Sequence, residues 1–173
     1  MGRLSRAVRL LAGTYLFAAA LWCGLLVAFA GGAGIVLHAS PTRAAGGAVN
    51  RALLDAADEA SYAAVGLLAL LFFALARGGA FDKLGRGFTL RLLLVAAAAT
   101  VVSHLLVTPE MVSLRERVGA AFDLLPKTDP LRRDWGRLHG LSVLALLLRI
   151  FCGGGLFALG FRATRPQPAG SQS

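Results

Sequence analysis

The sequence predicts an all-α integral membrane protein: one domain, an antiparallel four-helix bundle with an interfacial amphipathic helix between spans three and four. With 57% hydrophobic and 16% charged residues and a mean hydropathy of +0.68, the 173-residue chain is too apolar for a soluble domain. Four long apolar runs alternate with segments rich in Pro, Gly or charge. The net charge of +9 comes from basic residues flanking these runs, without the basic face of a nucleic-acid binder, so we expect no nucleic acid partner.

The first span is predicted at residues 10–38, within a transmembrane domain covering residues 1–161. Its apolar run is about twice as long as the roughly 7–15 residues of a signal-peptide core, so we expect it to be retained. Gly24 and Gly31 share one face of this helix. Glycines at such spacing allow a close approach of another helix, and we expect the same of Gly153 in the last span.

The second and third spans are predicted at residues 60–76 and 90–108, joined by a basic loop at 77–91. Asp58 and Glu59 come just before the second apolar run. We therefore expect them in the first turn of its helix, at the membrane surface, where acidic residues also suit the helix dipole. Thr100 lies on a polar edge of the third span.

Pro109 and Pro126 lie at the two ends of the segment between spans three and four. Pro109, next to Glu110, is expected to break the third helix. Residues 111–125 then carry apolar side chains every three or four positions, which predicts an interfacial amphipathic helix. Asp129 and Pro130 suit the N-cap and first turn of the last helix.

The fourth span, residues 138–161, contains the most informative face of the chain. Its polar side chains recur at spacings of three and four residues, which places them on one side of a helix. The members of this face are Trp135, His139, Ser142, Leu146, Arg149 and Gly153. A charge facing lipid costs at least about 2.5 kcal/mol at mid-membrane, so Arg149 should point into the bundle. Residues 162–173 are rich in Pro, Gly and Ser and are expected to form a disordered tail.

No Asp or Glu occurs in an apolar run at the expected depth of Arg149. We therefore expect its partners to be hydroxyls such as Thr100, backbone carbonyls, an anionic ligand or a lipid head group. On this interpretation, Arg149→Leu leaves the fold intact, because apolar atoms can refill the space.

Short motifs distributed over residues 21–159 resemble the transmembrane protein 205-like family, four-helix membrane proteins of largely unknown function. The motifs are Trp22-x-Gly24, Pro41 followed by Gly46, Pro109 at the end of span three, and His139-Gly140-x-Ser142 at the start of span four. The family usually has Asn four residues after that serine, where this chain has Leu146. The resemblance implies the same fold, with hints of drug- or metal-linked phenotypes and no established reaction.

The histidines are the candidate ligands for a metal ion or haem. His38, His104 and His139 lie near helix ends that an antiparallel topology brings to one membrane face, and we expect them within about 10 Å of one another. Structural hydrogen bonding, or a proton or substrate path, is the alternative. The residues of that polar pathway are Ser142, Arg149, Thr100, Asp58, Glu59 and Glu110.

Three function classes remain open. The leading one is a small transporter-like or metal- or ligand-binding bundle with a His/Ser/Arg polar site near one membrane face. The alternatives are a structural or assembly subunit, whose glycine faces bind protein partners or a second copy of the chain, and a haem b electron-transfer protein. The sequence contains no enzyme motif. Lys and Arg residues are nearly even on the two sides of the membrane, nine against eight, so the basic start of the first helix predicts both termini in the cytoplasm, here of a bacterial inner membrane.

Overall fold

The computed structural model describes residues 6–126 and 128–164, and these residues form an all-α four-helix bundle without a strand. Four helices are each long and apolar enough to cross a membrane, which makes the chain an integral membrane protein. The elements are α1 (Arg6–Ala39), α2 (Arg43–Arg77), α3 (Lys83–Val101), the π-helical η1 (Val102–Val107), α4 (Thr108–Val118), the 3₁₀-helical η2 (Gly119–Leu124) and α5 (Pro130–Thr164).

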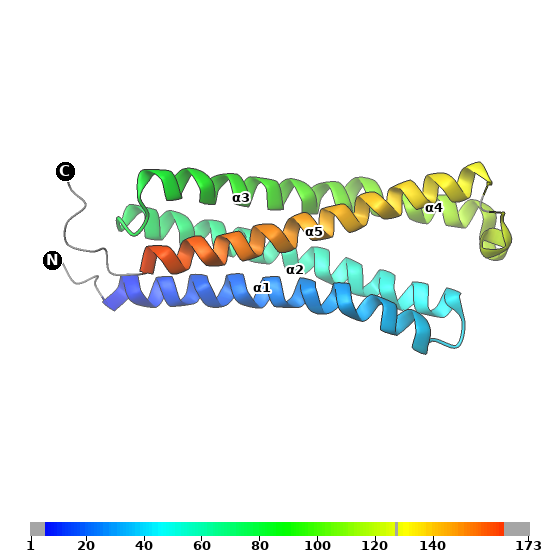
Figure 1. Ribbon diagram of the computed structural model, residues 1–173, viewed down its shortest axis with the longest axis horizontal. Coiled ribbons are helices and arrows are strands. Elements are labelled where there is room, and N and C mark those ends of the chain that lie inside the picture. The colour runs from blue at the N-terminus through cyan, green and yellow to red at the C-terminus, as the bar shows by residue number, and fades with distance from the viewer. Residues whose placement is uncertain (1–5, 127, 165–173) are drawn as a thin grey trace.

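The helices form an up-and-down ring in which each rod contacts its two neighbours. α1 packs against α2 and α5, and α3 packs against the same two helices. The first turn of α1, the α2–α3 turn and the last turn of α5 lie at one end of the bundle, and the α1–α2 turn and η2 lie at the other (Figure 1). We call these the turn end and the loop end.

Local side-chain caps explain where the helices begin. Thr42 accepts a hydrogen bond from the Ala45 amide at 3.1 Å, and Asp82 accepts one from Gly85 at 2.8 Å. Gly79, with φ of 74°, supplies the left-handed residue of the α2–α3 turn. Because Asp82 starts α3 early, residues 83–91 are helical, and the expected loop at 77–91 shrinks to 78–82.

The predicted break at Pro109 is wrong, because α3, η1 and α4 form one continuous rod (Figure 1). Proline cannot donate a backbone hydrogen bond, and in an α-helix its ring collides with the carbonyl four residues earlier. In η1 the hydrogen bonds reach one residue further, as when the Thr108 amide donates to the Ser103 carbonyl. This wider turn accommodates Pro109, so the amphipathic segment extends the third helix and packs against α5.

The last helix begins where the sequence predicts. Asp129 caps it by accepting a hydrogen bond from the Leu131 amide at 2.8 Å, and Pro130 is its first residue. Its end lies further along than expected, since α5 includes residues 162–164 of the predicted tail. The remainder of that tail, residues 165–173, lies outside the described part of the chain.

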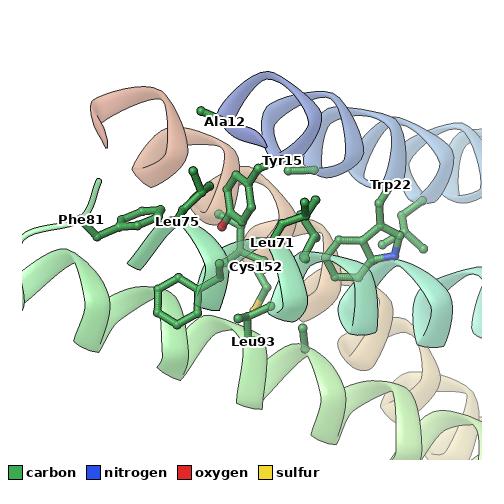
Figure 2. Packing of buried hydrophobic residues seen from close by; sticks show 14 of the residues in the cluster. Ala12, Tyr15, Trp22, Leu71, Leu75, Phe81, Leu93 and Cys152 are labelled. Carbon is green, nitrogen blue, oxygen red and sulfur yellow. The ribbon is translucent and has the colours of Figure 1, made fainter. Parts of the chain in front are cut away.

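The apolar core is concentrated toward the turn end. Figure 2 shows aromatic and aliphatic side chains from the four rods gathered between the helices. Phe81, from the α2–α3 turn, packs edge-on against Tyr15 and Phe72 with ring centroids 6.2 and 5.4 Å apart. The outer faces carry large apolar residues such as Leu70 and Phe151, a surface suited to lipid.

Candidate functional site

Arg149 lies in the interior of the bundle, as its helical face predicts. It has no exposed surface, and Ser142, Leu146 and Gly153 on the same face of α5 are buried with it. The opposite face is exposed, including Phe151 at 74%. Orientation of the guanidinium toward the other helices is therefore confirmed.

Its partner is Asp58 of α2, which corrects the expectation that no acid lies at this depth. Arg149 Nη1 donates to Asp58 Oδ1, and both side chains are fully buried. The error came from the expected start of the second helix. α2 begins at Arg43, so Asp58 lies roughly 22 Å along it rather than in its first turn.

Ser61, one turn beyond Asp58, connects this ion pair to α1. Its hydroxyl accepts a hydrogen bond from Trp22 Nε1 at 3.0 Å and donates to the Ala57 carbonyl at 2.7 Å. Arg149 Nη1 lies 3.5 Å from the same hydroxyl. Side chains from α1, α2 and α5 thus meet in one buried polar cluster.

His104, from η1, links this cluster to the outside of the bundle. Its Nδ1 lies 3.7 Å from Asp58 Oδ2, and its side chain is 33% exposed whereas Asp58 has no exposed surface. Tyr62 packs edge-on against the imidazole with ring centroids 5.7 Å apart. π-helical turns occur frequently at functional sites, and this one carries the histidine that approaches the ion pair. We refer to Asp58, Ser61, His104 and Arg149 as the charged cluster.

Several polar atoms of this region have no hydrogen-bond partner among the described residues. They are Asp58 Oδ2, Ser103 Oγ, His104 Nδ1, Thr108 Oγ1, Arg149 Nε and Arg149 Nη2. The 3.7 Å between His104 and Asp58 exceeds a hydrogen bond, so neither of those atoms satisfies the other. Buried polar groups are normally paired, so these donors and acceptors have room for a polar partner such as water or a ligand.

The three histidines do not form one site. His38 is exposed and donates through Nδ1 to the Gly34 carbonyl at 2.9 Å, while His139 is exposed and stacks on Trp135 with ring centroids 5.2 Å apart. Within residues 6–126 and 128–164, no three His, Cys, Asp or Glu side chains come together as metal ligands. His104 is the histidine that approaches the ion pair, at 3.7 Å from Asp58 Oδ2, whereas His38 and His139 make the local contacts given above.

The remaining polar candidates lie outside the charged cluster. Thr100 is fully buried, but its hydroxyl donates to the Ala96 carbonyl of its own helix at 2.9 Å. Glu59 is exposed, and Glu110 is exposed at 3.4 Å from Arg117. These three residues give Arg149 no partner in the described structure.

The expected packing role of the glycines holds for one of the three. A Cβ on Gly153 would lie 3.1 Å from Cys23 Cβ, so this glycine allows α5 to approach α1 closely. Gly24 and Gly31 are exposed, and a Cβ on either would meet no described atom within 4 Å. Their role in helix packing within the described chain is therefore wrong, because they face away from the other helices.

Comparisons with known proteins identify no relative: no family model, no curated protein and no solved structure matches the chain. The functional evidence in this chain is therefore the geometry and chemistry of the charged cluster.

Proposed function

We propose that this protein is a small transporter-like membrane protein whose charged cluster takes up a proton from one side of the membrane as a step of its transport cycle. One observation carries the proposal: a partly exposed imidazole approaches a fully buried carboxylate, which is paired with a fully buried guanidinium. His104 and Asp58 thereby form a stepwise route for a proton from the bundle surface to its interior.

Stability alone is a weak reason to place these charges here. Removing two charges from water is costly, and an apolar pair of similar volume is often as stable or more stable. Ionisable side chains inside membrane bundles usually mark proton relays or substrate paths. Among the described residues, Asp58 Oδ2 and two nitrogens of Arg149 have no partner, and an ion pair with a purely structural role does not need such free atoms.

The position of the charged cluster along α2 supports access from one side of the membrane. Glu59, next to Asp58, is exposed, and the following 17 residues up to Arg77 contain no Asp, Glu, Lys or Arg. This uncharged stretch spans roughly 27 Å, close to the thickness of the hydrocarbon layer. The charged cluster would then lie near the membrane face on the loop-end side, as expected for a site open to one compartment.

Proton flux in liposomes tests the proposal. Purified protein is reconstituted with internal pyranine in potassium phosphate, valinomycin is added to clamp the membrane potential, and an external acid pulse is applied. We expect the interior to acidify faster than in protein-free liposomes. Asp58→Asn should abolish the difference, because the buried carboxylate can no longer take a proton.

Asp55→Asn is the matched control. Asp55 lies on the same helix, but it is only half-buried and pairs with Arg51 at 3.9 Å. It should therefore retain full flux. Flux equal to that of protein-free liposomes, or wild-type flux in folded Asp58→Asn protein, would contradict the proposal.

The orientation proposed for the chain places both termini in the cytoplasm of a bacterial inner membrane. Support comes from the basic start of the first helix, Arg3, Arg6 and Arg9, since Lys and Arg are otherwise nearly even on the two sides. Reporter fusions at the C-terminus and in the α1–α2 turn should report opposite sides.

Membership of the transmembrane protein 205-like family is likewise proposed, with His139-Gly140-x-Ser142 as its most specific motif.

A further inference from the structure

We infer that the charged cluster binds a small oxyanion, a carboxylate or phosphate, on the free edge of the Arg149 guanidinium, and that one proton enters with it. The inference rests on the proposed function and names the substrate that accompanies the proton.

The free edge of Arg149 has the geometry that oxyanions need. Asp58 occupies Nη1, whereas Nε and Nη2 are buried without a partner among the described residues. Nε and Nη2 form the planar fork that binds both oxygens of a carboxylate or phosphate in parallel. Serine hydroxyls are suitable additional donors, and the buried Ser103 hydroxyl next to His104 on η1 is also unpaired.

Charge balance requires the accompanying proton. The buried pair of Asp58 and Arg149 is neutral overall, so an added monoanion, a carboxylate or dihydrogen phosphate, leaves one net negative charge in a desolvated site. Burying an uncompensated charge is strongly unfavourable. One proton on Asp58 or His104 restores neutrality, and a protonated Asp58 also releases Nη1 to the incoming anion.

The groups facing Asp58 limit where that proton can go. Arg149 faces it from α5 and His104 from η1, while Tyr62 of its own helix packs on His104. From α1, the Trp22 indole reaches the pair through Ser61, and the Cys23 thiol donates to the Ile150 carbonyl at 3.6 Å. The proton can therefore be taken up by Asp58 itself or by His104, which lies 3.7 Å from it.

Thermal unfolding of the purified protein in detergent tests the inference without requiring transport. Sodium acetate and inorganic phosphate are the soluble probes, lauric acid is the lipid-derived carboxylate, and sodium chloride controls for ionic strength. We expect an oxyanion to raise the Tm of the wild-type protein by a few degrees beyond chloride, and the apparent affinity to rise by up to about tenfold per unit of decreasing pH. A response to laurate alone assigns the oxyanion to the lipid phase.

Variants separate the two halves of the inference. Arg149→Lys keeps the charge but removes the fork, so the oxyanion response should be lost, whereas Arg137→Lys at an exposed position should keep it. Asp58→Asn mimics the protonated carboxyl, so binding should persist and lose its pH dependence. His104→Gln leaves the ion pair in place and serves as the second variant if Asp58→Asn does not fold. Oxyanion binding should persist in this variant. Its pH dependence should weaken if the imidazole carries the proton.

Each result has a distinct meaning. No oxyanion response in the wild type, or an unchanged response in folded Arg149→Lys protein, overturns the inference. A response of wild type that is independent of pH overturns the coupled proton. Proton flux that requires Asp58 without any oxyanion response leaves the proposed function standing alone, and an oxyanion response without proton flux overturns the proposed function while keeping the anion site.

Discussion

The two ends of the bundle differ in the side chains that fill their interior, which are apolar toward the turn end and charged toward the loop end. Toward the turn end, Tyr15, Phe72, Phe81 and Leu156 are buried in a continuous apolar core. Past Trp22 toward the loop end, the interior contains the charged cluster, and the surface carries ion pairs such as Arg51 with Asp55. The apolar half holds the helices together, so the other half can keep charges that contribute little to stability.

The largest effect is expected at the ion pair. Arg149→Leu should destabilise the protein by about 3–5 kcal/mol, because it leaves the Asp58 carboxylate buried without its counter-charge. This reverses the expectation from sequence, in which Arg149 had no acidic partner. Unfolding in detergent by a denaturant series measures the change. Arg137→Leu, which removes only an exposed pair with Asp134, should stay within about 0.5 kcal/mol of wild type.

The next largest effect should appear in the tightly packed half. A Cβ on Gly160 would lie 2.6 Å from the Tyr15 ring, and Tyr15 is fully buried and cannot move away freely. Gly160→Ala should therefore lower the free energy of unfolding by about 1–3 kcal/mol. Gly154→Ala is the matched control on the same helix, since its Cβ meets no described atom within 4 Å. Equal stability of the two variants would contradict close packing of α1 against α5.

Most of the fold follows from the apolar pattern, because four runs of this length admit few arrangements. The position of Arg149 follows from its helical face. Its partner could also be found in the sequence: Asp58, Ser61, Val65, Leu68, Phe72 and Leu75 recur at spacings of three and four residues. Extending the inward face of α2 backwards along this spacing predicts Asp58 inside the bundle. The apolar run alone does not reveal this inward position, because the run begins only after Asp58.

Other features depend on tertiary contacts that no local pattern carries. Pro109 predicts a break, and the helix continues only because η1 changes its hydrogen bonding. The sequence pattern places all three histidines near helix ends, yet His104 lies in the middle of the continuous rod Lys83–Val118, where it approaches Asp58 at 3.7 Å. Where a helix begins, and whether it continues past a proline, decides the depth of Asp58 and His104, and the apolar runs mark neither point.

The Trp22–Ser61 hydrogen bond marks the boundary between the two halves and should have a smaller effect. Ser61→Ala should cost about 0.6 kcal/mol and at most about 1.7 kcal/mol, the average and the upper limit for hydrogen bonds between membrane helices. Trp22→Phe removes the same bond along with some packing. Because both variants lose one shared interaction, the double variant should be less destabilised than the sum of the singles. Additive effects in the same unfolding assay would show that the bond contributes nothing.

The smallest effect is expected where α1 faces away from the bundle. Gly24→Ala and Gly31→Ala introduce a methyl group into open space, and alanine favours the helix by up to about 1 kcal/mol. Stability should be unchanged or slightly increased. A change in oligomeric mass in native mass spectrometry of either variant would instead assign this face to contact with a second copy of the chain.

Asp58 and Arg149 form one unit inside the bundle, and a double-mutant cycle tests this pairing. The free energy of unfolding is measured for wild type, Asp58→Leu, Arg149→Leu and the double variant. We expect each single variant to be strongly destabilised and the double variant to recover most of the loss, with a coupling of at least about 2 kcal/mol. Single effects that add to within about 0.5 kcal/mol would contradict the pairing and the function built on it.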